Sequence, residues 1–443
     1  MIKVYSIEEA RLSILKRDLN RKVKDKITNP EEIVRKIVKD VEEQQDKALT
    51  YWTLMLDKVS IEKFEISDIN FEESIKNIDP DLRNALEIAS KRIYRFHKSQ
   101  PISSWMDLEL GGKLGQIIKP IQKIGIYIPG GIAPLFSSVL MTAIPAIVAG
   151  CKDFIFCSPP NQSGNLSTII LASCGLIKRF GANVRIFKIG GAQAIAAMAF
   201  GTEQVPKVDK IVGPGNIYVN LAKKEVYGKV GIDGIYGPTE ALIIADQTAN
   251  PSLIASDLIA QAEHDFLAIP ILLTSAPNLV PLIEKELERQ VELQKRKNAI
   301  KSSFKRNGGI ILTSSIEESI QISNIFAPEH LSLMVKDPLS YLDQIESAGG
   351  VFIGEDSYEV LGDYIAGPSH VMPTNGTARF SSALSVYDFI KIINIVHLNK
   401  EMSLKLTPHA EIMAKFENLD GHANAAYLRS IDNENYKGGN LIE

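Results

Sequence analysis

The chain of 443 residues is 45% hydrophobic and 23% charged, which is the composition of a globular protein long enough to form two domains with separate cores. Its net charge of -4, with Lys and Arg scattered among Asp and Glu, excludes the basic stripe that a nucleic-acid partner would require. The longest apolar stretch, residues 139–151, is interrupted by Pro145 and is shorter than the ~20 residues of a membrane helix, so we expect no membrane partner and interpret it as a buried helix.

The beginning of the chain predicts a helix rather than a targeting segment. Residues 1–20 mix charged and apolar side chains at helical spacing, without the continuous apolar run and small-residue cleavage site of a signal peptide. The cysteines Cys151, Cys157 and Cys174 form no C-x-x-C pair, and their apolar neighbours indicate buried structural thiols. We therefore expect a cytoplasmic protein in a reducing compartment.

The segment up to about residue 100 is predicted to be helical. In NPEEIVRKIVKDVEEQQDKALTYW, Asn29 is a suitable helix cap, Pro30 suits the first helical position and acidic residues follow. Apolar residues then recur three and four positions apart, so one face of this helix should pack against a core.

From about residue 115, short β-rich runs alternate with glycines and helical patterns. The successive blocks are KIGIYIPGG, SSVLMTAIPAIVAG, DFIFCSPP, NLSTIILASCGLIKRFG and VRIFKIGGAQAIAAMAFG. After a turn at residues 231–237 the alternation restarts with ALIIAD, SDLIAQAEHD, PILLTSA, a charged helix over 278–298 and GGIILTSS. This alternation predicts two α/β units with parallel sheets. The tail after about residue 385 is predicted to be helical.

Possible metal ligands occur in three segments. Gln261 and His264 are three residues apart in a predicted helix and so project from one face, although a lone Q-x-x-H is also typical of a solvated polar face. Asp363 in LGDYIAGPSH and His422 in ENLDGHANAA lie in glycine-bearing segments. Such oxygen and nitrogen donors suit an open zinc site, but sequence spacing does not show that they converge.

The adjacent pair Glu329 and His330 offers two bases of different strength. Because a strand-like run and a proline precede them in IFAPEHLSL, we expect a loop at the end of a strand, where α/β folds collect their active sites. A reaction with two proton removals would suit this pair. The alternative interpretation is a helix N-terminus with a charged first turn.

Ordered blocks along nearly the whole chain resemble the histidinol dehydrogenase family. The blocks are RIYRFHKSQ, GIYIPGG, SSVLMTAIPAIVAG, GGAQAIAAMAFGT, VDKIVGPGNIYV, GPTEALIIAD, AQAEHD, APEHL, GDYIAGPSHVMPT, GTARFSSALSV and ENLDGHA. The resemblance implies oxidation of L-histidinol through L-histidinaldehyde to L-histidine, the last steps of histidine biosynthesis, with NAD as the oxidant and one zinc ion per subunit.

The same resemblance implies an intertwined homodimer of two incomplete Rossmann-like domains with parallel sheets and helical arms, whose active site is shared between subunits. It implies the following division of the chain: an N-terminal helical arm over 1–30, a first α/β domain over 31–126 and 233–385 with the zinc and substrate residues, a second α/β domain over 127–232 with the NAD contacts, and a C-terminal helical dimerisation arm over 386–443.

By matching motif positions, the resemblance also implies residue roles. Zinc would be held by Gln261, His264, Asp363 and His422, the last reaching in from the partner subunit. His330 would be the general base, and Glu329 would activate the water that adds to the aldehyde. The substrate contacts would be Thr239, Gln261, His264, His330, Asp363, His370, Glu417 and His422, and the dinucleotide contacts would be Tyr127, Gln193 and Asn216.

The residues alone support the dinucleotide site less strongly. GGAQA follows the run VRIFKI and opens a helix, which places backbone N–H groups where a phosphate could sit, but no G-x-G-x-x-G occurs. The chain also departs from the family: Thr239 replaces the usual Ser, Met372 replaces Leu, and the 130–138 loop lacks the usual Tyr-Pro pair. We expect Thr239 to alter affinity rather than chemistry and the changed loop to alter cofactor affinity, and we attach no functional weight to Met372, which nearly conserves volume.

Two rival functions remain compatible with the sequence. A paralogous zinc and NAD dehydrogenase could oxidise another polar or amino alcohol, although His370, Glu417 and His422 favour an imidazole-bearing substrate. A catalytically inactive metal- or nucleotide-binding module would be expected to lack bases, whereas Glu329 and His330 are both present.

Overall fold

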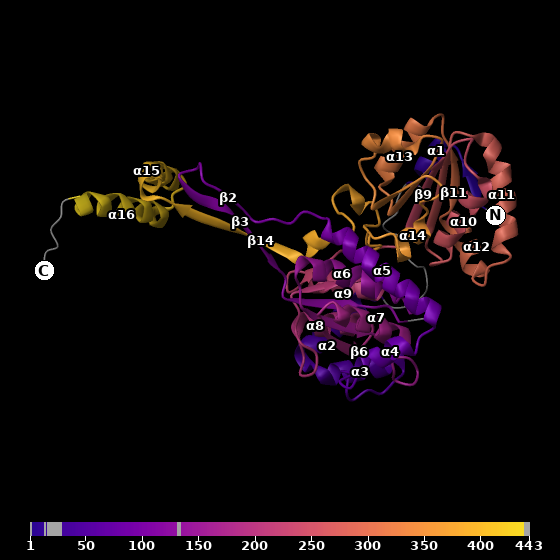
Figure 1. Ribbon diagram of the computed structural model, residues 1–443, viewed down its shortest axis with the longest axis horizontal. Helices are drawn as coiled ribbons and strands as arrows, with labels where there is room; N and C mark the ends of the chain where they lie inside the picture. The colour runs from indigo at the N-terminus through magenta and orange to yellow at the C-terminus, as the bar shows by residue number, and fades with distance from the viewer. Residues whose placement is uncertain (1, 13–14, 16–28, 131–133, 438–443) are drawn as a thin grey trace. The chain divides into compact units, whose positions relative to one another are not determined.

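The computed structural model describes residues 2–12, 15, 29–130 and 134–437, and the chain forms two compact units. The larger unit comprises Met1–Gln100 and Ile121–Phe389, and the smaller comprises Pro101–Pro120 and Ile390–Glu443. Figure 1 shows that the larger unit contains two separate α/β layers.

A six-stranded parallel sheet forms one half of the larger unit. Its strands, in spatial order, are β1 (Lys3–Tyr5), β11 (Gly309–Leu312), β10 (Ile269–Thr274), β9 (Glu240–Ala245), β12 (His330–Met334) and β13 (Gly350–Ile353). The central strands β9, β10 and β12 are buried along their whole length, as expected for a parallel sheet covered on both faces.

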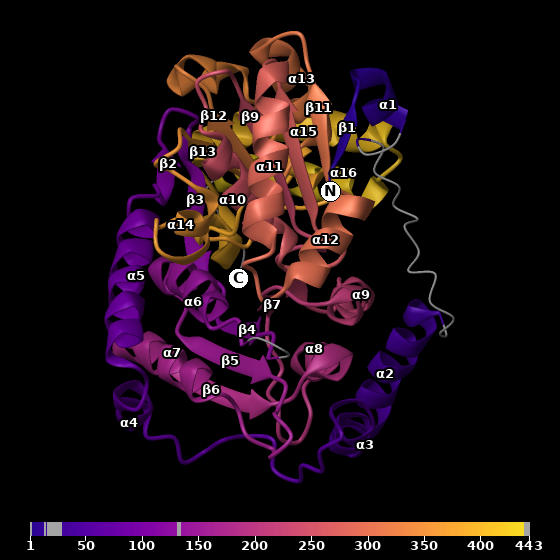
Figure 2. The same cartoon turned by 90° about the vertical axis from the view of Figure 1, so that its right-hand side faces the viewer.

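Helices cover both faces of this sheet. One face packs on α10 (Pro251–Ala262), α11 (Val280–Val291) and α12 (Lys297–Arg306), which Figure 2 shows in front of the strands. The other face packs on α1 (Ile7–Leu12) and α13 (Ile316–Phe326). Three short 3-10 segments in this half are η1 (Pro277–Leu279), η2 (Pro338–Gln344) and η3 (Thr377–Arg379), and α14 (Glu359–Tyr364) follows β13.

The second half is a five-stranded parallel sheet. Its strands, in spatial order, are β6 (Asn183–Lys188), β5 (Asp153–Ser158), β4 (Lys123–Tyr127), β7 (Lys210–Val212) and β8 (Gly231–Ile232). One face packs on α2 (Pro30–Gln44), α3 (Asp46–Asp57), α8 (Gly191–Phe200) and α9 (Ile217–Val226). The other packs on α4 (Phe71–Lys76), α5 (Pro80–Lys98), α6 (Ser137–Ala149), α7 (Thr168–Arg179) and η4 (Val386–Phe389).

The parallel α/β architecture predicted from the alternating blocks is confirmed. Asn29 caps α2 as expected, accepting a hydrogen bond from the Glu31 amide at 3.3 Å, with Pro30 at the first helical position. The packing nevertheless differs from the expected division, because the helices of residues 30–98 cover the five-stranded sheet, whereas the expectation grouped 31–126 with the other sheet. Apolar spacing shows that a helix has a buried face, but not which sheet it covers.

Three local expectations were wrong. The chain begins with strand β1, which pairs with β11, before the short helix α1, and the rest of the predicted arm, residues 13–14 and 16–28, lies outside the described residues. The charged helix expected over 278–298 is two helices, α11 and α12. The run before Glu329 is helix α13, because Ser315 caps it by accepting the Glu318 amide, a local bond that outweighs the β-branched isoleucines.

The smaller unit combines a short sheet with two helices. Its antiparallel strands are β14 (Ile390–Leu398), β3 (Gly112–Pro120) and β2 (Trp105–Asp107), and its helices are α15 (Lys400–Phe416) and α16 (Asp420–Lys437). The tail expected to be helical therefore starts as a nine-residue strand, and residues 101–120 belong to the same unit. The β-branched run Ile392, Ile393 and Ile395 explains the strand.

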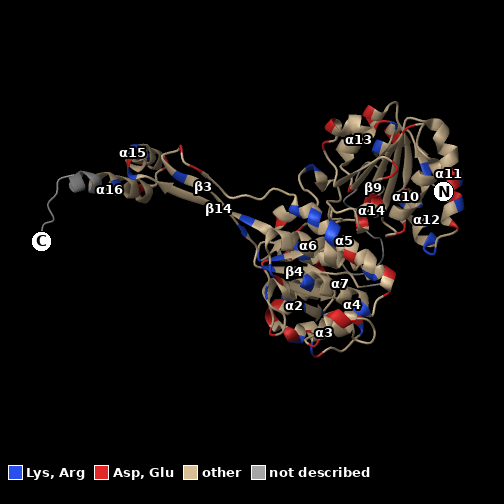
Figure 3. Ribbon diagram, in the orientation of Figure 1, with Lys and Arg blue, Asp and Glu red and all other residues tan. Residues whose placement is uncertain are grey.

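The described residues agree with the predicted burial of the cysteines and show mixed surface charge. Cys151, Cys157 and Cys174 are all free and buried. Figure 3 shows Lys and Arg interspersed with Asp and Glu on the helices. Among the described helices, none combines the length and apolar character needed to cross a bilayer.

Candidate active site

A pocket in the larger unit is lined by both α/β halves. The five-stranded half contributes segments that follow strands β4 and β7, including Ser138 and Gly215. The six-stranded half contributes residues at the start of β9 and β12, including Thr239 and His330. Glu329 and His330 therefore lie at the amino end of strand β12. We expected them to follow the end of a strand, and this was wrong because the segment before them is helix α13.

A chain of hydrogen bonds fixes Glu329 in this pocket. Its Oε2 atom accepts the Thr239 hydroxyl at 2.6 Å and the Glu240 amide at 3.0 Å. The Thr239 Oγ1 atom in turn accepts the Gln261 side-chain amide at 2.8 Å. Burial raises the pKa of Glu329, which is 8% exposed. The carboxyl is thus held rigidly in a poorly solvated position, where it is a stronger base than usual.

The environment of His330 leaves one of its ring nitrogens available as a base. Nδ1 lies 3.1 Å from the Glu240 carbonyl oxygen, which can only accept, so Nδ1 carries the proton in the neutral ring. Nε2 is buried and has no hydrogen-bond partner within the described part of the chain. Burial alone would lower the pKa of His330, but the carboxyls of Glu359, Glu329 and Asp363 outweigh it and raise that pKa well above its usual value. The carboxyls therefore favour the imidazolium, and His330 can accept a substrate proton only when its ring is neutral.

His370 is oriented by two contacts. Its Nδ1 atom lies 2.7 Å from the Asp363 carbonyl oxygen, which fixes the proton on that nitrogen, and its Nε2 atom lies 3.4 Å from the Ser138 hydroxyl. Since both residues line the pocket, Nε2 presents an acceptor there.

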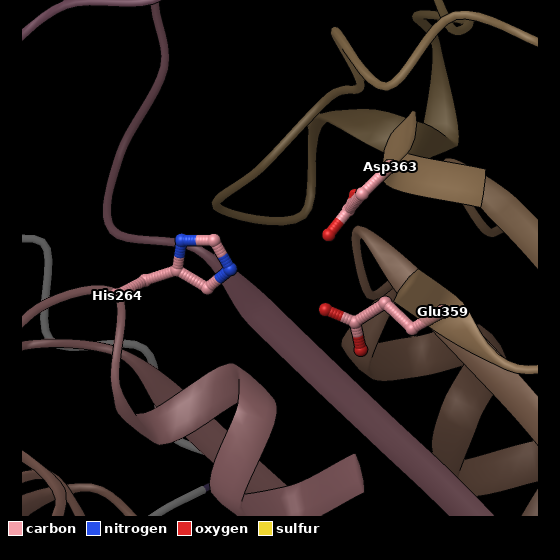
Figure 4. A group of neighbouring side chains, drawn as sticks. All are labelled: His264, Glu359 and Asp363. Carbon is pink, nitrogen blue, oxygen red and sulfur yellow. The ribbon is translucent and has the colours of Figure 1, made fainter. Parts of the chain in front are cut away.

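Next to this pair, His264, Glu359 and Asp363 form a cluster of metal-binding side chains. One ligand atom from each lies within 4.8 Å of the others. Figure 4 shows the imidazole facing the two carboxyls. His264 follows α10, whereas Glu359 and Asp363 lie one turn apart on α14. The sequence analysis missed Glu359, although its spacing of four residues before Asp363 is a signal that could have found it.

Gln261 adds an oxygen donor of the kind a metal would require. The Gln261 side chain is fully buried, its amide nitrogen is committed to Thr239, and its Oε1 atom has no partner among the residues that the structure describes. Buried polar atoms are normally satisfied, so an orphaned oxygen points to a missing ligand. The imidazole, carboxyl and amide donors fit zinc, which accepts nitrogen and oxygen ligands.

The predicted dinucleotide residues lie in the five-stranded half. Tyr127 ends β4, and its hydroxyl accepts the Gly191 amide at 3.1 Å at the start of α8, which confirms the predicted strand–glycine–helix arrangement. Gln193 is fully buried, its Nε2 atom lies 3.4 Å from Asp57 Oδ2, and its Oε1 atom lacks a partner in the described chain. Asn216 caps α9 by accepting the Tyr218 and Val219 amides. Their roles in binding stay predictions.

A fully buried ion pair supports the wall of the pocket. Lys223 Nζ lies 2.7 Å from Asp233 Oδ1, with neither side chain exposed. The Lys223 ammonium also donates to the Gly213 carbonyl, while the Asp233 carboxyl accepts the Gly213 and Gly234 amides. Because Pro214 and Tyr236 line the pocket, this pair holds two of its lining segments.

Other predicted site residues lie outside this pocket. Glu417 ends α15 and His422 lies in α16, and both are exposed residues of the smaller unit. The 130–138 loop, in which the Tyr-Pro pair is replaced, includes residues 131–133, which are outside the described residues.

Comparisons with known proteins show the family of the chain. Residues 20–430 match the family model described as histidinol dehydrogenase. A histidinol dehydrogenase from Thermus thermophilus is 45% identical over 96% of this chain and 100% of the relative. One from Dehalococcoides mccartyi is 45% identical over 90% of this chain and 91% of its own length.

A solved structure extends the similarity to the fold. The crystal structure of histidinol dehydrogenase from Elizabethkingia anophelis has a TM-score of 0.90 and 38% sequence identity, covering 98% of this chain and 99% of that one. Sequence and fold thus agree over nearly the full length, and the chain belongs to the histidinol dehydrogenase family of oxidoreductases.

Proposed function

We propose that the protein oxidises L-histidinol to L-histidine in two NAD-dependent steps, with L-histidinaldehyde between them. The single observation that carries this proposal is the pair Glu329 and His330, held in one pocket of a histidinol dehydrogenase fold, with the Nε2 atom of His330 lacking a hydrogen-bond partner among the described residues. Two oxidations of one carbon require two hydride acceptors and two proton removals, so two NAD molecules are reduced for each histidinol consumed.

In the first step, His330 would take the hydroxyl proton at Nε2 while the carbon-bound hydrogen leaves as hydride to the nicotinamide. The Glu240 carbonyl holds Nδ1, so the ring presents Nε2 without reorientation. The surrounding carboxyls stabilise the imidazolium formed. His370, with its acceptor Nε2, would bind a polar hydrogen of the substrate.

Glu329 would then remove a proton from the water that adds to the aldehyde. Its fixed position and raised pKa suit this role, since a carboxylate of ordinary pKa is a weak base. His330 would act again on the resulting hydrate: a second hydride leaves to NAD, a second proton leaves the oxygen, and the carboxylate product forms. Both steps use the same base on the same carbon.

Zinc would be held by Gln261, His264 and Asp363, with His422 of a partner subunit completing the set implied by the family resemblance. When bound, zinc supplies a Lewis-acidic centre that can hold the amino and imidazole nitrogens of the substrate. The protein side chains orient the reacting carbon. Holding it in the correct geometry lowers the activation barrier of hydride transfer. Glu417 would contribute a further substrate contact from the partner.

The homodimer is supported by apolar surface on the smaller unit. Phe416 is 87% exposed, Val396 72% and Met413 66%, in a unit with little core of its own. Large apolar side chains exposed on both β14 and α15 favour cover by a second chain. We also propose that NAD contacts Tyr127, Gln193 and Asn216, and that the protein functions in the cytoplasm, where its three free thiols would stay reduced.

The decisive experiment measures NADH formed per histidinol consumed by zinc-loaded protein and identifies the product. Two NADH per histidinol, with histidine as product, is the expected result. Oxidation of another amino alcohol but not of histidinol would identify the protein as a paralogue with a different substrate. Absence of NADH with every amino alcohol tested would overturn the proposed reaction.

A further inference from the structure

The segment that leads from α14 to His370 is held by helices of the other α/β half. It covers residues 365–370, after α14 ends at Tyr364. α14 follows the six-stranded sheet, whereas α5 and α6 pack on the five-stranded sheet. Figures 1 and 2 both show α14 next to α5. Because Tyr364 and His370 line the pocket, whatever fixes this segment also fixes one wall of the pocket.

The guanidinium of Arg92, in α5, bridges two consecutive carbonyls of the 365–370 segment. Its Nε atom donates to the Ile365 oxygen at 2.9 Å, and its Nη2 atom donates to the Ala366 oxygen at 3.1 Å. Both carbonyls follow the last turn of α14, where a cation is favourable because helix carbonyls point toward it. A planar guanidinium presents its N–H groups in a fixed fork, so two adjacent acceptors define the position of the segment.

Two further contacts hold the same segment against the five-stranded half. Gly367 has a φ of +137°, and a Cβ atom placed on it would lie 3.0 Å from the Cβ atom of Phe96 in α5. The segment therefore approaches α5 so closely that this position favours glycine. Ser369 is buried and donates its hydroxyl to the Met141 carbonyl in α6 at 2.9 Å. The 365–370 segment is thus anchored on both helices.

The position of His370 depends on this anchoring. The Nδ1 atom of His370 lies 2.7 Å from the Asp363 carbonyl oxygen, just before the segment. The backbone that Arg92 holds therefore orients the ring, whose Nε2 atom is the proposed acceptor for a polar hydrogen of histidinol. Arg92 itself is not among the described residues that line the pocket. Losing its hydrogen bonds would move the acceptor without removing any group from the pocket.

We propose that Arg92 is a positioning residue for histidinol: by holding the carbonyls of Ile365 and Ala366, it keeps His370 Nε2 where the substrate binds. This inference rests on the proposed function and adds to it a residue outside the pocket, from the other α/β half. His370 would contact the substrate equally before and during hydride transfer, so its displacement should weaken binding rather than slow the chemical step. Arg92 therefore affects KM for histidinol more than kcat.

The test is steady-state kinetics of Arg92→Gln in the full-length, zinc-loaded protein. Arg92 is exposed, so the variant should fold, which thermal unfolding checks. KM for histidinol should rise about threefold to tenfold, the worth of one hydrogen bond, while kcat and KM for NAD change little. Arg92→Lys keeps the charge but lacks the fork of N–H groups, so it should recover part of the affinity. An unchanged KM for histidinol, or a fall in kcat alone, would overturn the proposal.

Arg95→Gln is the matched control, because Arg95 is an exposed arginine of the same helix, three residues further along. It loses the same charge and should leave KM for histidinol unchanged. An equal rise of KM in both variants would mean a general charge effect and would contradict the assignment to Arg92.

A double-mutant cycle tests whether Arg92 acts through His370. Calorimetry measures histidinol binding to the zinc-loaded protein. In protein that already carries His370→Gln, the further change Arg92→Gln should weaken binding much less than it does alone, since coupled residues have non-additive effects. Fully additive losses would exclude the route through His370. If the unaltered protein does not oxidise histidinol, the proposed function fails; if it does, and Arg92→Gln behaves like Arg95→Gln, only the role of Arg92 fails.

Discussion

The two parallel sheets of the larger unit line the pocket with opposite ends of their strands, one with the carboxyl ends and the other with the amino ends. The five-stranded sheet contributes segments that follow β4 and β7, where parallel α/β folds usually place their ligands. The six-stranded sheet contributes residues at the start of β9 and β12. A site built from both ends can bring a dinucleotide and a second substrate together from different directions, which one sheet alone does not provide.

The chemical character of the two sides differs equally. On the six-stranded side, Glu329, Glu359 and Asp363 surround His330 within 4 Å. On the five-stranded side, the neutral groups Tyr127 and Gln193 lie at the start of α8, and the buried Lys223 and Asp233 are paired with each other. The difference teaches that buried charges gather on the proposed reactive side, while backbone geometry dominates on the proposed cofactor side.

The largest expected effect is on the reactive side. Replacing His330 by Asn should lower turnover by roughly 10²–10⁴-fold, the usual contribution of a general base, with a much smaller change in KM for histidinol. Steady-state kinetics measures both constants. His397→Asn, at an exposed histidine of the smaller unit, is the control. Undiminished turnover in the His330 variant would remove this residue from the mechanism.

Removing the buried ion pair would test whether the five-stranded side of the pocket depends on Lys223 and Asp233 for its stability. Lys223→Met leaves Asp233 buried without its partner, which should cost about 3–5 kcal/mol in the free energy of unfolding. Urea unfolding measures this cost, and Lys224→Met, at the exposed neighbour, should change it by less than about 0.5 kcal/mol. Equal stability of the two variants would show that the pair is not a structural support.

Thr239 connects Glu329, one of the two candidate bases, to Gln261, one of the candidate metal donors. Thr239→Val keeps the shape of the side chain but deprives Glu329 and Gln261 of a hydrogen-bond partner. Leaving these buried groups unsatisfied should lower the free energy of unfolding by about 1–3 kcal/mol. We expect lower kcat/KM and weaker zinc binding. Thr239→Ser retains the hydroxyl and should stay close to the unaltered protein. Similar losses in both variants would show that the site does not depend on the Thr239 hydroxyl in particular.

A smaller effect is expected at Tyr127. Tyr127→Phe removes the acceptor of the Gly191 amide, so NAD affinity should weaken by about 0.5–1.5 kcal/mol, the net worth of one hydrogen bond. Calorimetric titration with NAD measures the change, and zinc affinity should be unaffected. A loss of zinc binding instead would contradict the separation of the two sides.

Asp57 gives the smallest expected effect, which appears as a pH dependence of stability. Burial raises the pKa of Asp57 to about 6 from its ordinary value of 3.8. The native state then binds more protons than the unfolded state between these values, so this group lowers stability as pH rises through that window. Asp57→Asn should remove this decline, as urea unfolding at pH 4.5 and 7 would show. The same decline in the variant would exclude Asp57 as its source.

Part of this molecule was predictable from sequence because the information is local. Strand and helix alternation follows from apolar periodicity, and it correctly predicted the parallel sheets and the capped helix α2. Local capping at Ser315 could also have revealed that a helix precedes Glu329. The candidate bases and ligands were found because His, Glu and Asp occur in recognisable motifs.

Tertiary structure decided everything that depends on segments distant in sequence. Thr239 and Glu329 are ninety residues apart, yet they share a hydrogen bond because β9 and β12 are adjacent in the sheet. The tautomer of His330 and the orphaned oxygen of Gln261 likewise follow from neighbours that only packing supplies. Sequence by itself determines which chemical groups are present and which local elements carry them. Folding determines which of these groups come into contact. The burial of a side chain and its hydrogen-bond partners depend on all the residues packed around it, and most of those are distant in sequence.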